Sequence, residues 1–118
     1  MARTVVVVDD HQGFRELARA FLTGAGYDVV GDAANGRSAL EAVAAHRPDI
    51  VLLDVRLPDL DGFEVARRLA AEPVPPVVIL VSSRDETDYA GRLARCGARA
   101  FITKSKLTPR SLEAALAS

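Results

Sequence analysis

The stretch that decides the fold is Ile50-Val-Leu-Leu-Asp54-Val-Arg-Leu-Pro58-Asp-Leu-Asp61-Gly62. Its first four residues form an apolar run without polar alternation, which is typical of a strand buried on both faces of a parallel sheet. The run stops at the carboxylate of Asp54, and Pro58, Asp61 and Gly62 then indicate a loop that leads into a helix. Because open α/β sheets hold their ligands at the carboxyl ends of the strands, Asp54 is the first candidate functional residue.

The same alternation of strand and helix extends in both directions from this stretch. Short β-branched or apolar runs predict further strands at 4–8, 28–33, 77–81 and 100–103. Apolar residues at helical spacing predict helices over 12–22, 38–45, about 63–71 and 85–96, and a last helix that starts at Pro109 with Thr108 as its N-cap.

Five repeats of strand and helix, joined by short connections, predict parallel pairing with right-handed crossovers. We therefore expect one α/β domain over residues 1–118, a three-layer α/β/α sandwich around a five-stranded parallel sheet. The runs at 4–8, 50–54 and 77–81 are the most apolar and should be central, whereas 28–33 has polar margins and should lie at an edge. These features favour the flavodoxin-like strand order 2-1-3-4-5.

Composition narrows the function classes. The 118 residues are 49% hydrophobic and 26% charged, and no segment has the pattern of a membrane span or a signal peptide. The net charge of −1 gives no electrostatic reason to expect direct binding of nucleic acid. Cys96 is the only cysteine, so an internal disulfide is excluded and a small buried hydrophobe on a helix is expected. We expect a cytoplasmic protein.

Polar residues follow four of the predicted strands. Asp9 and Asp10 follow the first, Asp54 ends the third, Ser82 follows the fourth and Lys104 follows the fifth. In a parallel sheet these ends meet at one edge, where three close carboxylates cannot all stay ionised without a cation. Hard oxygen ligands suit Mg²⁺ (or Mn²⁺), and a compact ammonium suits a position beside an anion.

These residues, in this order and spacing, resemble the receiver domains of bacterial two-component response regulators, and the resemblance covers the whole chain. The runs Asp9-Asp10-His11 with Arg15 and Val30-Gly-Asp-Ala-Ala-Asn-Gly36 look most like receivers joined to LuxR/NarL-type helix-turn-helix domains. The resemblance implies a signalling switch whose own phosphorylation and dephosphorylation are its only chemistry, rather than an enzyme that acts on other substrates.

The resemblance also implies a role for each site residue. Asp54 would be the phosphoacceptor, served by the phosphohistidine of a sensor histidine kinase or of a phosphotransfer domain. Asp10, Asp54 and the backbone carbonyl of Arg56 would ligate Mg²⁺ (or Mn²⁺), and Asp9 would act mainly through water. Lys104 would pair with the phosphoryl group.

Ser82 and Phe101 are the implied switch residues. Ser82 would donate a hydrogen bond to the phosphoryl group, and Phe101 would turn inward and change the surface of the fourth helix, fifth strand and fifth helix. Many relatives have tyrosine at position 101, whereas phenylalanine has no hydroxyl that could favour one orientation of the ring. A role in core packing alone is the alternative for Phe101. A DNA-binding output domain outside this sequence and a phosphorylation-dependent homodimer are the further implied partners.

Five other residues remain, and a role is expected for some of them. Arg56 and Arg84 lie two residues beyond Asp54 and Ser82, and we expect them to control the access of water or a phosphodonor to the acyl phosphate. Phe14 is either core packing or a kinase-docking contact. His11 and His46 are expected to be surface residues without a role.

Two other function classes compete with the phosphorylation switch. A receiver-like interaction module that signals without phosphate would keep the fold, although such proteins usually lose some of the acidic and switch residues present here. A phosphohydrolase of the haloacid dehalogenase type also uses an aspartate at a strand end, but it needs a second aspartate two residues later, where this chain has Arg56.

Overall fold

The sheet has the predicted strands in the predicted order. The structure is a computed structural model that describes residues 2–84 and 89–117. The strands are β1 (Thr4–Val8), β2 (Asp28–Ala33), β3 (Ile50–Asp54), β4 (Val77–Ser82) and β5 (Ala100–Thr103). All neighbours pair in parallel in the order β2-β1-β3-β4-β5, which confirms the flavodoxin-like arrangement.

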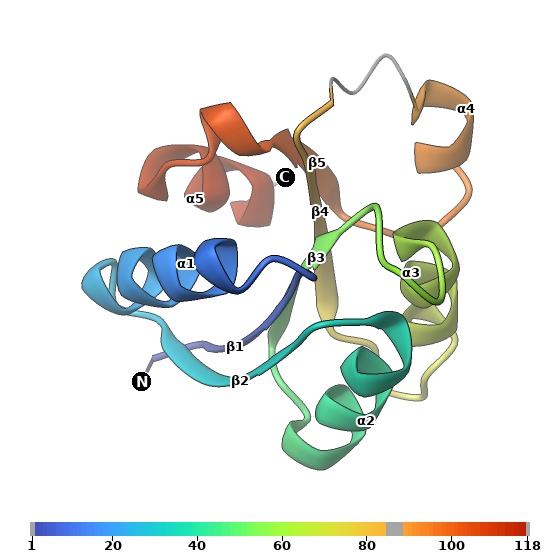
Figure 1. Cartoon of the computed structure of the whole chain (residues 1–118), viewed down its shortest axis with the longest axis horizontal. Coiled ribbons are helices and arrows are strands. Elements are labelled where there is room, and N and C mark those ends of the chain that lie inside the picture. The colour runs from blue at the N-terminus through green and yellow to red at the C-terminus, as the bar shows by residue number, and fades with distance from the viewer. Residues whose placement is uncertain (1, 85–88, 118) are drawn as a thin grey trace.

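Helices cover both faces of this sheet. Figure 1 shows α1 and α5 on one side and α2, α3 and α4 on the other, which confirms the three-layer sandwich. Within the described part of the chain, none of the helices is long and apolar enough to span a bilayer. The helices are α1 (Gln12–Gly24), α2 (Gly36–His46), α3 (Gly62–Ala70), α4 (Ala90–Leu93) and α5 (Pro109–Ala117), with a 3₁₀ turn, η2 (Lys104–Lys106), before α5.

Helix α4 ends earlier than predicted. The sequence predicted a helix over 85–96, of which 85–88 lie outside the described residues, and α4 stops at Leu93. The chain must turn here to reach β5, and Gly97 makes that turn with a left-handed φ of 81°. A Cβ built on Gly97 would lie 2.7 Å from Ala70 Cβ. Within the described residues, α4 is therefore one helical turn long, and the turn at Gly97 beside α3 leads the chain on to β5.

The core forms two layers because β3 is buried on both faces. Val51 and Leu53 pack in the cluster under α2 and α3, whereas Ile50 and Leu52 pack in the cluster under α1 and α5. Burial on both faces is what the unbroken apolar run predicted. The same placement leaves the carboxyl end of β3 in the middle of the sheet edge, between β1 and β4.

The loop after β3 is fastened to two helices. Asp59 accepts hydrogen bonds from the backbone N–H groups of Gly36 (2.7 Å) and Arg37 (2.9 Å) at the start of α2. Asp61 caps α3 by accepting from the Glu64 N–H at 2.9 Å. At Gly62 a Cβ would lie 2.3 Å from the carbonyl oxygen of Asp54, so only glycine fits there. The backbone beyond Asp54 is thus held close to the sheet.

Candidate functional site

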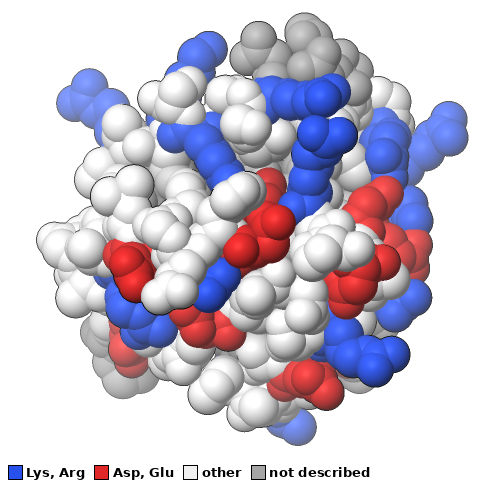
Figure 2. Space-filling model, in the orientation of Figure 1, with Lys and Arg blue, Asp and Glu red and all other residues white. Residues whose placement is uncertain are grey.

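The predicted site residues meet at one edge of the sheet. A cavity of about 350 Å³ opens there, and its lining includes Asp10, Asp54, Ser82 and Lys104, which follow or end four different strands. The space-filling view shows acidic side chains near the centre of this face with basic side chains beside them (Figure 2). The parallel sheet therefore assembles an acidic pocket from residues that are far apart in the chain.

Lys104 is shared unequally between two buried carboxylates. Its Nζ lies 2.6 Å from Asp9 Oδ2 and 3.8 Å from Asp54 Oδ2. The Asp9 side chain is fully buried, Asp54 is 4% exposed and the Lys104 side chain is 20% exposed. Because the Coulomb attraction falls with distance, the Lys104 ammonium stabilises the negative charge of Asp9 more than that of Asp54.

The electrostatic environment of Asp54 is set first by its burial and then by the neighbouring charges. The pKa of Asp54 is raised from 3.8 to about 6, mainly by burial and then by the charge of Asp9, whereas Lys104 acts to lower it. The carboxyl group is still mainly ionised at neutral pH. It is therefore a desolvated anion, and a cation or proton in the cavity would stabilise its negative charge.

The neighbours of Asp9 hold it in place. Its Oδ1 accepts a hydrogen bond of 2.8 Å from the His11 backbone N–H. The guanidinium of Arg15 donates to the Asp9 carbonyl oxygen at 2.7 Å and also lies 3.4 Å from Asp32 at the end of β2. Lys104 Nζ sits 4.3 Å from the centre of the Phe14 ring. Phe14, which is half-buried, thus supports the lysine as well as the core under α1.

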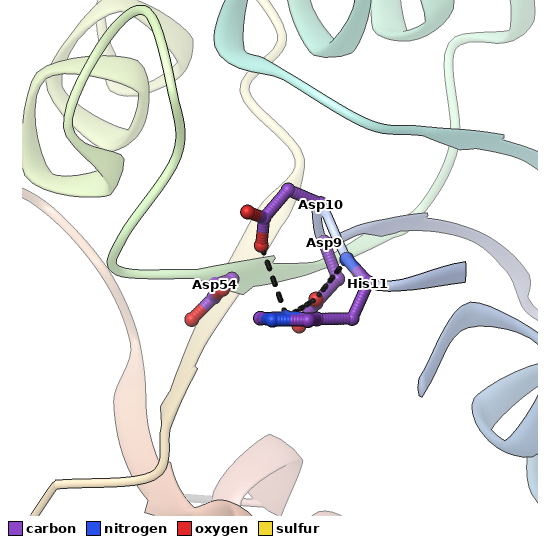
Figure 3. A group of neighbouring side chains, drawn as sticks. All are labelled: Asp9, Asp10, His11 and Asp54. Atoms are coloured by element: carbon purple, nitrogen blue, oxygen red, sulfur yellow. Dashed lines mark hydrogen bonds and ion pairs between the residues drawn. The ribbon is translucent and has the colours of Figure 1, made fainter. Parts of the chain in front are cut away.

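His11 lies in the acidic cluster, although no role was expected for it. Its Nδ1 is 3.1 Å from Asp9 Oδ1 and 3.1 Å from Asp10 Oδ1, as the dashed lines in Figure 3 show. Ligand atoms of Asp9, Asp10, His11 and Asp54 all lie within 4.8 Å of one another. The position directly after the paired aspartates was the available signal, because a turn at a strand end folds that side chain back over them.

Ser82 is buried and contacts the segment that follows β4. It is 1% exposed, and its Oγ accepts a hydrogen bond of 3.1 Å from the Arg84 backbone N–H. The same Oγ lies 3.4 Å from the hydroxyl of Tyr89. Phe101 is half-buried, and its ring centre lies 5.9 Å from that of Tyr89. Tyr89 lies in a segment for which the sequence predicted only a helix, so this contact with Ser82 was missed.

The two arginines expected near the phosphoryl position differ in placement. Arg56 lines the cavity, whereas Arg84 is absent from the described lining and contributes its backbone N–H to Ser82. Both residues are exposed.

Comparison with known proteins gives one family. The family model described as the response regulator receiver domain matches residues 5–117. The "Probable transcriptional regulatory protein NarL" of Mycobacterium tuberculosis is 39% identical over 113 residues, which is 95% of this chain and 52% of that protein. The chain thus spans about half the length of the curated relatives it matches first.

Solved structures of response regulators have the same fold as this chain. The signal receiver domain of the NarL response regulator from M. tuberculosis has a TM-score of 0.85 at 36% identity, covering 99% of this chain and 98% of that one. A LuxR-family two-component response regulator from Aurantimonas sp. SI85-9A1 has a TM-score of 0.87 at 28% identity, covering 99% of this chain and 84% of that one.

Proposed function

Because the chain belongs to the response regulator receiver domain family of two-component systems, we propose that it is a phosphoacceptor switch in which Asp54 receives a phosphoryl group from a phosphohistidine. An Oδ of Asp54 forms a bond to phosphorus while the phosphorus–nitrogen bond of the donor breaks. The bonding electron pair stays on the imidazole nitrogen, which takes up a proton from solvent, and Asp54 becomes an acyl phosphate.

The observation that carries this proposal is the environment of the Asp54 carboxylate. It ends the central strand β3, opens into the cavity, and has the Lys104 ammonium 3.8 Å away. Phosphoryl transfer has a loose transition state, so positioning and charge neutralisation supply most of the catalysis. Of the two buried carboxylates, Asp54 has the weaker ion pair with Lys104. Its oxygen is therefore the one left available to react with phosphorus.

The donor set of the cluster fits Mg²⁺ (or Mn²⁺). Asp10 and Asp54 present carboxylate oxygens to the cavity, and hard oxygen donors with space for water suit these ions. We assign direct ligation to Asp10, Asp54 and the backbone carbonyl of Arg56. Asp9, whose oxygens already bind Lys104 and the His11 N–H, acts mainly through water. When bound, the ion neutralises charge on the carboxylates and on the phosphoryl oxygens.

Three side chains respond to phosphorylation of Asp54: Lys104, Ser82 and Phe101. Lys104 moves its charge from Asp9 toward the phosphoryl oxygens, and the Ser82 hydroxyl donates to one of them. Phe101 fills the space that Ser82 leaves, which changes the surface formed by α4, β5 and α5. This surface then controls an output domain or a phosphorylation-dependent homodimer.

The partners follow from the same proposal. A sensor histidine kinase or phosphotransfer domain supplies the phosphoryl group in the cytoplasm, and a DNA-binding output domain outside these 118 residues receives the signal. With a net charge of −1, there is no electrostatic reason to expect this domain itself to bind nucleic acid.

Incubation with a small acyl phosphate donor and Mg²⁺ tests the assignment. Intact-protein mass spectrometry should detect one added phosphoryl group on the unsubstituted chain and none on Asp54→Asn. No addition, together with no binding of beryllium fluoride, favours the phosphate-independent interaction module. Steady turnover of generic phosphoesters favours the hydrolase class.

The arginine hypothesis has its own measurement. Arg56 lines the cavity, so Arg56→Ala should change the lifetime of the acyl phosphate by altering the approach of water. Arg84→Ala tests the same role for a side chain outside the described lining. Unchanged lifetimes in both variants would remove the hypothesis.

A further inference from the structure

Tyr89 connects Ser82 to the aromatic group beneath α4. Its hydroxyl lies 3.4 Å from Ser82 Oγ. Its ring centre lies 5.4 Å from that of Phe63 on α3 and 5.9 Å from that of Phe101 on β5, with tilted planes at 57° and 52°. Tyr89 therefore touches both residues assigned to the switch and stands directly before α4.

The hydroxyl that Phe101 lacks is present on Tyr89. The chain has two tyrosines, and the other, Tyr27, donates to Glu113 Oε1 at 2.8 Å on the α1–α5 side of the sheet. A tyrosine hydroxyl with an apolar ring around it prefers the orientation that finds a polar partner. At this site the partner is Ser82, so Tyr89 supplies the hydroxyl that a tyrosine at position 101 would otherwise carry.

The partners of Ser82 Oγ keep it on the α4 side. Among the described residues, both of its hydrogen-bond partners, the Arg84 N–H and the Tyr89 hydroxyl, come from the segment after β4. Asp54 lies on the neighbouring strand, paired in register with Val81. Either hydroxyl can be the donor in the Ser82–Tyr89 contact, which at 3.4 Å is already long for a hydrogen bond between hydroxyls. When Ser82 rotates its Oγ toward a group on Asp54, the Oγ moves away from the α4 side and this contact is lost.

We propose that Tyr89 is a positioning residue that restrains Ser82 in the unmodified protein and is released when Ser82 binds the phosphoryl group. The inference rests on the proposed function of Asp54. Once released, Tyr89 keeps only its ring contacts with Phe63 and Phe101, so the loss of one hydrogen bond at Ser82 changes the packing at the start of α4.

The test is the affinity of the whole chain for beryllium fluoride in the presence of Mg²⁺. Tyr89→Phe keeps both ring contacts and removes only the hydroxyl, so it should bind about two- to fivefold more tightly, equivalent to about 0.4–1 kcal/mol. Tyr27→Phe, which also loses one tyrosine hydrogen bond, should bind as the unsubstituted chain does. In a Ser82→Ala background, Tyr89→Phe should have no effect.

A second measurement reports on the residue itself. With 3-fluorotyrosine incorporated, the two ¹⁹F resonances are assigned by the two phenylalanine variants. Beryllium fluoride should shift the Tyr89 resonance and leave that of Tyr27 in place.

Two results overturn the inference while the proposed function stands. One is equal or weaker binding by Tyr89→Phe, and the other is the same gain with and without Ser82. Absence of binding to the unsubstituted chain, or equal binding to Asp54→Asn, overturns the proposed function and the role of Tyr89 with it.

Discussion

Replacing Asp54 with asparagine should make the metal-free protein more stable at neutral pH. The substitution removes one negative charge from a buried position beside Asp9 and keeps the size and shape of the side chain. Asparagine is close to the protonated form of aspartate. The gain in the free energy of unfolding is therefore the cost of ionising Asp54 in the folded state.

The magnitude follows from the pKa. The folded state raises the pKa of Asp54 from 3.8 to about 6, so the folded protein holds this proton more tightly than the unfolded chain does. Between these two values the folded state binds more protons, and stability falls as pH rises. At about 1.4 kcal/mol for each unit of pKa, the cost is about 2–3 kcal/mol at pH 7 and below about 1 kcal/mol at pH 4.

Urea denaturation followed by far-ultraviolet circular dichroism, in EDTA at pH 7, 5 and 4, measures the difference. Asp28→Asn is the matched control, because it changes the net charge equally at an exposed carboxylate on the opposite edge of the sheet. Asp54→Asn should be more stable than the unsubstituted chain and the control at pH 7, and the advantage should shrink toward pH 4. Equal stability at pH 7, or an advantage independent of pH, would refute the reasoning.

Mg²⁺ should raise the melting temperature of the unsubstituted chain more than that of Asp54→Asn, because the asparagine variant has lost a ligand; thermal unfolding with and without EDTA measures this, and equal rises would place the ion elsewhere. Gly62→Ala should cost about 2 kcal/mol or more, since the new Cβ meets the Asp54 carbonyl oxygen at 2.3 Å. Gly13→Ala, with nothing within 4 Å, should be neutral or stabilise by up to about 1 kcal/mol, and equal costs in urea denaturation would contradict the steric account. Tyr27→Phe should lower the free energy of unfolding by about 1 kcal/mol, because its hydroxyl donates to Glu113 at 2.8 Å. The loss should disappear in a Glu113→Ala background.

The sheet could be predicted from sequence because it depends on local pattern and on one general rule. The run Ile50–Asp54 has to be buried on both faces, and parallel strands bring their polar ends to one edge. Those two statements were enough to predict that four side chains meet at one edge of the sheet, and all four line the cavity: Asp10, Asp54, Ser82 and Lys104.

The distribution of contacts inside that cavity could not be predicted in this way. Spacing along the chain does not say that Lys104 lies 2.6 Å from Asp9 and 3.8 Å from Asp54, because the rotamer of a long side chain decides it. Tyr89 and His11 were missed for a related reason. His11 directly precedes α1 and Tyr89 directly precedes α4, and the direction of a side chain at such a position depends on backbone angles that apolar periodicity does not report.

The pairing of Lys104 with Asp9 joins positions 95 residues apart, and this separation bears on the synthesis of the protein. A ribosome releases the chain from its N-terminus, so Asp9, Asp10 and Asp54 are available long before the lysine that compensates them. Until β5 pairs with β4, a nascent chain carries the carboxylates without their ammonium. On the proposed function, the pocket around Asp54 is therefore complete only when the last strand joins the sheet.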